Sequence, residues 1–203
     1  MMVMQHFVLW RFGLAPAETQ TTEAEPACLA HYAKGRARLA EIGVWHGVTT
    51  RRLRQAMSAD GWLYAVDPYP RGRLGFSTQL IIGHREAGKV RNGSVVWVRM
   101  TGADAARELL PHAPFDFVFI DGDHTYQGLQ ADWAGWSPLM AEGGYVALHD
   151  SRSTPQRRID DAGSVRFTRD VIKKDARFEV VDAVDSLTIL RRVGLTASLP
   201  SAA

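Results

Sequence analysis

Residues 38–47 read Arg38-Leu39-Ala40-Glu41-Ile42-Gly43-Val44-Trp45-His46-Gly47. The first half is a short, largely apolar run that predicts a β-strand at Arg38–Ile42. Two glycines follow, and glycine lets the backbone approach a ligand closely at a strand-to-helix turn. Dinucleotide-binding turns usually show GxGxxG, whereas Val44, Trp45 and His46 give the spacing GxxxG here. By spacing alone, this turn is as consistent with helix packing as with ligand binding.

An alternation of strands and helices extends from this stretch in both directions. Such an order predicts a mostly parallel sheet with helices on both faces, followed by an antiparallel hairpin at Phe178–Val181 and Ser186–Arg191. Further strands are predicted at Trp62–Val66, Val95–Arg99, Phe115–Ile120 and Tyr145–Leu148, and helices at Ala27–Lys34, from Thr49 to Asp60-Gly61, at Ser77–Ala87, Ala103–Leu110 and Gln127–Trp136.

The composition fits one globular domain. The chain has 203 residues, of which 46% are hydrophobic and 23% charged, which argues against disorder and coiled coil. A net charge of +2, with basic residues spread along the chain, makes nucleic acid an unlikely partner. We expect a leader at residues 1–20, one domain at 21–193 and a loose tail at 194–203.

Targeting signals are weak in this sequence. Met1–Leu14 is apolar but short, has no basic leading region and contains Arg11, so neither a signal peptide nor a membrane span is predicted. The single Cys28 cannot form an internal disulfide and is interpreted as a helix-packing residue, which fits a reducing compartment. We therefore predict a cytoplasmic protein without membrane contact, whose leader could pack against a second subunit in a homodimer.

Polar residues gather after the predicted strands, where parallel sheets of this kind bind their ligands. Asp67 ends the second strand, 20 residues after Gly47, and a carboxylate there can accept hydrogen bonds from both hydroxyls of a ribose. The glycine turn and Asp67 together favour binding of a nucleoside-containing ligand.

These residues, together with Phe115–Tyr126 (FDFVFIDGDHTY), resemble motifs of class I S-adenosylmethionine-dependent methyltransferases. The subgroup most similar to them is the small-molecule O-methyltransferases with an IDGDHxY segment, as in methyltransferase family 24. The similarity extends over residues 20–193 and includes Gly143–Asp150 and Asp185–Leu187. It implies an α/β, Rossmann-like, doubly wound fold, with a mostly parallel seven-stranded sheet and a C-terminal antiparallel hairpin.

The resemblance also implies a cofactor, S-adenosylmethionine, and residues that bind it. Asp104 has a second interpretation, because helical residues follow it directly and it could be a helix N-cap. The expected cofactor residues are Glu41, Gly43 and Gly47 in the first turn, with Glu41 and Gly43 at the methionine part, Asp67 at the ribose, Gly102, Ala103 and Asp104 near the adenine, and Asp121.

A second group of polar residues follows the fourth and fifth predicted strands. Asp121, Asp123 and His124 come after one strand, and His149 and Asp150 after the next. Adjacent strands lie about 4.8 Å apart, so Asp121 and Asp150 could share one Mg²⁺, which prefers oxygen ligands. Alternatively, both aspartates orient the cofactor amine or cap loops without a metal.

An ion at this place would lower the pKa of a substrate hydroxyl and fix its direction. His124 lies three residues after Asp121, where metal-dependent O-methyltransferases often have a general base, and histidine suits that role. Asp150 is followed by Ser151, where catechol-type enzymes usually have asparagine. We interpret His149 as a neutral partner of Asp150 and Asp132 as a structural residue under the site.

The sequence therefore predicts methyl transfer to a hydroxyl of a small molecule, such as a phenol, a sugar or a polyketide, with Asp121 and His124 as catalytic residues. One alternative is a binding module that keeps the cofactor pocket without turnover, as a partner subunit or a regulator. Another is a nicotinamide-dependent oxidoreductase, which the GxxxG spacing and the lack of an evident hydride-transfer pair disfavour.

Overall fold

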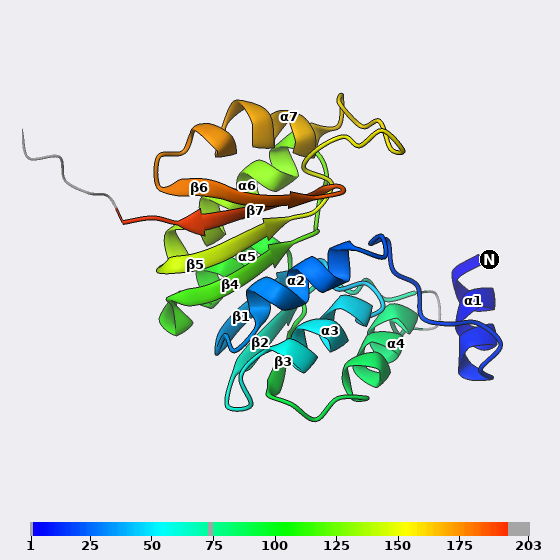
Figure 1. The fold of residues 1–203 in the computed structure, drawn as a ribbon. Coiled ribbons are helices and arrows are strands. Elements are labelled where there is room, and N and C mark those ends of the chain that lie inside the picture. Colours follow the sequence, from blue (N-terminus) through cyan, green and yellow to red (C-terminus); the bar gives the residue numbers. More distant parts are fainter. Residues whose placement is uncertain (1, 73–74, 195–203) are drawn as a thin grey trace, which may run out of the picture.

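Strand β1 (Arg38–Ile42) is the third strand of a seven-stranded sheet in the computed structural model, which describes residues 2–72 and 75–194. The strand order is β3-β2-β1-β4-β5-β7-β6. The first five strands are parallel, whereas β7 runs antiparallel to both of its neighbours. The fold is the expected Rossmann-like α/β architecture with a C-terminal antiparallel hairpin (Figure 1).

The other elements have the following bounds. The remaining strands are β2 (Trp62–Val66), β3 (Ser94–Val98), β4 (Phe115–Ile120), β5 (Met140–Leu148), β6 (Phe178–Val184) and β7 (Leu187–Arg192). The α-helices are α1 (Met2–Arg11), α2 (Glu25–Ala33), α3 (Val48–Ala56), α4 (Thr78–Ala87), α5 (Gly102–Glu108), α6 (Tyr126–Trp136) and α7 (Gly163–Asp170), and short 3₁₀ turns are found at Leu110–His112, Ser137–Leu139 and Ile172–Lys174.

The alternation of side chains along each strand divides the core into two layers. In β1, Ala40 and Ile42 face the layer formed with α5, α6 and α7, whereas Leu39 faces the layer formed with α2 and α3. Helices α2, α3 and α4 lie on one side of the sheet and α5, α6 and α7 on the other (Figure 1). Cys28 is buried in α2 as the packing residue that the sequence predicts.

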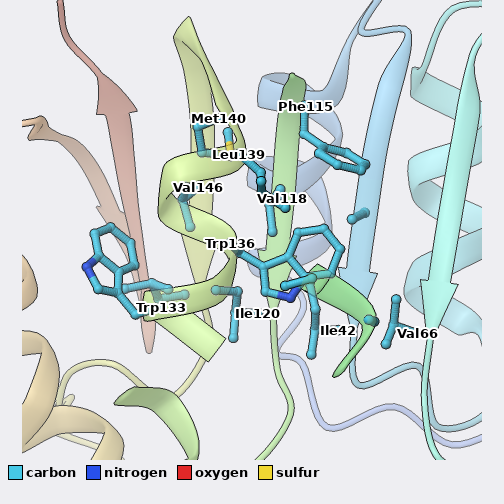
Figure 2. Packing of buried hydrophobic residues seen from close by; sticks show 14 of the residues in the cluster. Ile42, Val66, Phe115, Val118, Ile120, Trp133, Trp136, Leu139, Met140 and Val146 are labelled. Atoms are coloured by element: carbon cyan, nitrogen blue, oxygen red, sulfur yellow. The ribbon is translucent and has the colours of Figure 1, made fainter. Parts of the chain in front are cut away.

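Helix α6 packs its apolar stripe against the sheet. Leu129, Trp133 and Trp136 follow one another at spacings of four and three residues and are all buried. Figure 2 shows Trp136 beside Phe115 and Val118 of β4, and the Trp136 ring meets Phe115 edge to face at 5.3 Å. Trp133 lies apart from them, with its ring 4.7 Å from that of Phe178 in β6. Truncating a buried tryptophan costs about 3–5 kcal/mol, so this stripe fixes the rotation of α6.

The residue after each of four strands still donates its backbone N–H across the sheet. The loops that follow these strands therefore begin at the same edge and at the same level. The bonds run from Gly43 to Val66 (2.9 Å), from Asp67 to Val98 (3.1 Å), from Asp121 to Ile42 (2.7 Å) and from His149 to Ile120 (3.0 Å).

Strands β1, β2 and β4 have the predicted bounds, whereas β3, β6 and β7 differ from prediction by one to three residues at their ends and β5 differs by more. Strand β5 begins at Met140 rather than at Tyr145, because it continues through the two glycines that predicted a turn, with a register shift opposite β4 and Gly143 at φ +72°. Helix α7 was not predicted. The hydroxyl of Ser164 in its first turn donates to the carbonyl of Asp150, a contact between distant residues.

The predicted leader is helical and packs on its own chain. The ring of His6 in α1 stacks on His46 in the turn after β1, with centroids 5.2 Å apart, and Phe7 lies 6.2 Å from Phe76. Of the predicted tail, residues 195–203 lie outside the described residues. Within the described part of the chain, no helix has the length and apolar character needed to cross a membrane.

Candidate functional site

A cavity of about 690 Å³ opens at the carboxyl ends of the parallel strands. Its walls come from the turns after β1, β2, β3 and β4, from the middle of α6 and from residues 18–20 of the N-terminal segment. The order of the sheet reverses between β1 and β4, and ligands of doubly wound folds bind at such a reversal. Its volume lies in the range of small-molecule sites.

The expected site residues divide into two groups. Most of them line the cavity, whereas the others lie behind its wall or at the surface. The lining includes Gly43, Asp67, Gly102, Ala103, Asp121 and His124, and it does not include Glu41, Gly47, Asp104 or Asp150.

Gly43 lets the turns after β1 and β4 touch. Its φ of +85° lies in the left-handed region that favours glycine. A Cβ atom at this position would lie 2.0 Å from the carbonyl oxygen of Asp121. The glycine is therefore required by its own conformation and by the adjacent turn, which carries the second group of predicted site residues.

Asp67 joins the turns after β1 and β2. Its Oδ2 accepts the backbone N–H groups of Val44 and Trp45, both at 3.1 Å, and its Oδ1 accepts that of Tyr69 at 2.8 Å. A carboxylate offers about four acceptor positions, so capacity for one more donor remains. Asp67 lines the cavity as well as holding the two turns together.

Glu41 lies under the glycine turn. Its side chain is fully buried on the α3 side of β1, and Thr50 Oγ1 donates to Glu41 Oε2 at 2.5 Å. Burial outweighs this bond and raises the pKa of Glu41 to about 8. Glu41 Oε1 is buried with no hydrogen-bond partner among the described residues. Glu41 thus supports the turn as a neutral acid and does not form the cavity wall.

Gly47 and Asp104 have structural roles that the sequence left open. A Cβ atom on Gly47 would lie 2.9 Å from the Cα of Gly83, so Gly47 allows α3 and α4 to approach closely. Asp104 is in the first turn of α5, where its N–H bonds to the hydroxyl of Thr101, and its half-exposed carboxylate pairs with Arg107. The helix N-cap is therefore Thr101 and not Asp104, which is the third residue of α5, so the N-cap interpretation of Asp104 was wrong.

His124 lies between two carboxylates at the cavity wall. Its Nε2 is 3.1 Å from Oδ1 of Asp121, and its Nδ1 is 3.1 Å from Oδ2 of Asp150. The hydrogen bond to Asp121, and then the contact with Asp150, raise the pKa of His124 to about 9. Its side chain remains 35% exposed, so this imidazole can meet a molecule in the cavity.

His149 lies beside Asp150 as expected, with its Nδ1 3.7 Å from Oδ1 of Asp150, but its surroundings favour the cationic form rather than the expected neutral one. Its Nδ1 lies 2.8 Å from Oδ1 of Asp121, and its Nε2 lies 3.4 Å from Oε2 of Glu25, both as ion pairs without hydrogen-bond alignment. Burial lowers the pKa of His149, but these two carboxylates outweigh it and raise the pKa to about 10. Ser186 donates twice to Glu25 and fixes that carboxylate.

Asp150 forms an ion pair with Arg157, which belongs to the loop after β5. Arg157 contacts both carboxylate oxygens, with Nη2 2.7 Å from Oδ2. Burial would raise the pKa of Asp150, but the adjacent cations lower it to about 2. The network is balanced in charge, because Glu25, Asp121 and Asp150 face His124, His149 and Arg157.

The side chains do not fit the expected Mg²⁺ between Asp121 and Asp150. The imidazole of His124 lies between the two carboxylates, and Arg157 already binds Asp150. Asp121, His124 and His149 do offer ligand atoms within 4.8 Å of one another. Two of these three groups are imidazoles, however, and Mg²⁺ prefers oxygen ligands.

Several parts of the site were not predicted from the sequence. Residues 18–20 belong to the predicted leader, Arg157 to a loop without a motif, and Glu25 to a helix start. Asp132, which we interpreted as structural, lines the cavity. Of these, only Glu25 carried a local signal: Thr22 precedes it by three residues, and the two residues cap the start of α2 reciprocally.

Comparison with known proteins gives one family match and many solved structures of the same fold. A family model described as a methyltransferase domain matches residues 40–151. An O-methyltransferase from Bacillus cereus, solved in complex with S-adenosylhomocysteine, is 18% identical with a TM-score of 0.64, over 95% of this chain and 89% of that chain. The O-methyltransferase TomG from Streptomyces achromogenes, involved in tomaymycin synthesis, is 17% identical with a TM-score of 0.62. The match covers 95% of this chain and 89% of TomG.

Some solved structures of the same fold are described as methylases of RNA and not of small molecules. An rRNA methylase from Streptococcus thermophilus is 12% identical with a TM-score of 0.58, and the match covers 87% of this chain and 100% of that chain. Identities this low show a common fold and not a common acceptor.

Proposed function

The chain belongs to the class I S-adenosylmethionine-dependent methyltransferases, and we propose that it methylates a hydroxyl group of a small molecule. The observation that carries this proposal is His124, a histidine held by two carboxylates in the wall of the cavity that Gly43 and Asp67 also line. When bound there, S-adenosylmethionine supplies an activated methyl group on a positively charged sulfur.

The cavity has suitable groups for each part of this cofactor. Gly43 and the start of α3 would hold the methionine part, since Val48 and Thr49 line the cavity and no side chain caps the helix. Free N–H groups at a helix N-terminus favour a carboxylate. Asp67 would accept a ribose hydroxyl with its remaining capacity, and Gly102 with Ala103 would lie against the adenine.

His124 would act as the general base toward the acceptor hydroxyl. Both ring nitrogens face carboxylates, so the neutral imidazole must first turn one nitrogen from its carboxylate toward the acceptor hydroxyl. That nitrogen removes the proton as the hydroxyl oxygen attacks the methyl group, and the resulting imidazolium is stabilised by Asp121 and Asp150 once the ring returns. Through its contact with Asp121, His149 holds that carboxylate in place. The remaining contribution is positioning, because a fixed hydroxyl in line with the methyl group reacts much faster than a free one.

The shape of the cavity supports a small acceptor. Glu18, Thr19 and Gln20 line the same cavity as His124. The backbone N–H of Glu18 donates to Nδ1 of the buried His46 at 3.1 Å, which fastens this segment to the turn after β1. A segment held there narrows the space that an acceptor has beside His124, which favours a phenol, sugar or polyketide over a polynucleotide.

Calorimetric titration and an acceptor screen test this function together. We expect S-adenosylmethionine and S-adenosylhomocysteine to bind, NAD not to bind, and release of S-adenosylhomocysteine with at least one member of a panel of phenols, sugars and polyketides. Binding of NAD instead would support an oxidoreductase. Binding of S-adenosylmethionine without turnover on any acceptor would support a binding module without catalysis.

Removal of divalent metal is expected to leave turnover within about twofold of its value in Mg²⁺, because protonated imidazoles and Arg157 already neutralise the carboxylates. Initial rates after dialysis against EDTA, with and without added Mg²⁺, measure this. Loss of activity in EDTA with recovery in Mg²⁺ would contradict it and would restore the magnesium site predicted from Asp121 and Asp150.

A further inference from the structure

A carboxyl group without a partner projects into the cavity from α6. Asp132 is only 5% exposed and lines the cavity, yet no hydrogen bond or ion pair connects its side chain to another described residue. Its oxygens face the cavity and are therefore available to hydrogen-bond a ligand that binds there.

Two glycines make room for this carboxyl group. A Cβ atom on Gly102 would lie 2.3 Å from Asp132 Oδ1, and one on Gly122 would lie 3.2 Å from Asp132 Oδ2. The group is therefore enclosed between the turns after β3 and β4. Trp136, one turn further along α6, donates from Nε1 to the carbonyl of Gly102 at 3.0 Å, and its packing in Figure 2 fixes the helix.

The surroundings of Asp132 make its neutral form available near neutral pH. Burial, and then the charge of Asp123, raise the pKa of Asp132 to about 7. A protonated carboxyl group presents an O–H donor beside a carbonyl acceptor, as the amide of asparagine presents an N–H donor beside its carbonyl. Asparagine and glutamine use this pair to recognise adenine, whose amino group donates beside a ring nitrogen that accepts.

We infer that Asp132 recognises the adenine ring of the cofactor, accepting a hydrogen bond from its 6-amino group and donating to an adjacent ring nitrogen. This inference rests on the proposed function, in which Gly102 and Ala103 lie against the adenine. Asp104, the carboxylate that the sequence placed near the adenine, is 49% exposed and pairs with Arg107 instead. Asp132 would therefore set the preference for an adenine cofactor.

Calorimetry with two ligands tests the inference: S-adenosylhomocysteine and its 6-deamino analogue, in which purine replaces adenine. Wild-type protein is expected to bind the analogue roughly 10- to 100-fold more weakly, because its site then keeps an unmade hydrogen bond. Asp132→Leu should weaken S-adenosylhomocysteine by a similar factor and bind both ligands equally. Asp132→Asn keeps a donor and an acceptor and should retain the preference, as should the surface control Asp104→Asn.

The outcomes separate this inference from the proposed function. If wild-type protein does not bind S-adenosylhomocysteine, the proposed function fails. If it binds both ligands equally, or if Asp132→Leu weakens both by the same factor, Asp132 has only a structural role and the inference is overturned. Loss of the preference in Asp104→Asn would assign the adenine to Asp104. The wild-type comparison stands even if the leucine variant does not fold.

Discussion

Replacing His124 with glutamine is expected to lower kcat by about 10²- to 10⁴-fold, the usual contribution of a general base. Glutamine can still donate a hydrogen bond to Asp121, but it cannot take up a proton from a hydroxyl at neutral pH. The affinity for S-adenosylhomocysteine should change little, because Asp67 and Gly43 do not depend on this side chain. Release of S-adenosylhomocysteine with an acceptor from the panel, and calorimetry, measure the two effects.

The pH profile of the same pair of proteins separates His124 from Asp121 as the base. The pKa of His124 is raised to about 9, so at pH 7 roughly 1% of it is neutral and able to accept a proton. We expect kcat/KM of the wild type to rise about tenfold per pH unit from pH 6 and to level near pH 9. A flat profile over this range, or full activity in His124→Gln, would exclude His124 as the base.

The strands beside the site could be predicted because their signals are local. Phe115–Ile120 is apolar at every position except Asp116, and Arg38–Ile42 and Trp62–Val66 are short β-rich segments next to turn residues, so their bounds agree with the structure. The carboxyl ends of parallel strands share one edge, which is why Asp67 and Asp121 could be assigned to the same cavity. Helix α7 lacked such a signal, since its first turn is fixed by distant contacts.

Two members of the charged network, Glu25 and Arg157, could not be predicted, because no local pattern links them to the residues that they contact. His149 follows β5, whereas Glu25 is brought to it from the start of α2. Arg157 reaches Asp150 from an irregular loop. These contacts decide the charges of the group: they make His149 cationic and leave no place for the predicted Mg²⁺. The sequence therefore located the polar residues but could not assign their protonation.

Substitution of Gly43 with alanine is expected to weaken binding of S-adenosylhomocysteine by at least about 100-fold and to destabilise the fold by several kcal/mol. The left-handed conformation, at φ +85°, costs about 1–3 kcal/mol for a residue with a side chain. The new Cβ atom would also lie 2.0 Å from the Asp121 carbonyl, so the turns after β1 and β4 must separate. Calorimetry and thermal unfolding measure the two losses.

Gly35→Ala separates the backbone strain of Gly43 from the contact between the two turns. Gly35 has a similar φ of +69°, but no atom lies within 4 Å of the position of an added Cβ. Its alanine variant should therefore lose only the stability that strain accounts for and should bind S-adenosylhomocysteine as the wild type does. If the two variants lose equal stability and both retain the cofactor, then the contact with Asp121 is dispensable. A selective loss in Gly43→Ala shows that binding depends on the meeting of β1 and β4, where the strand order reverses.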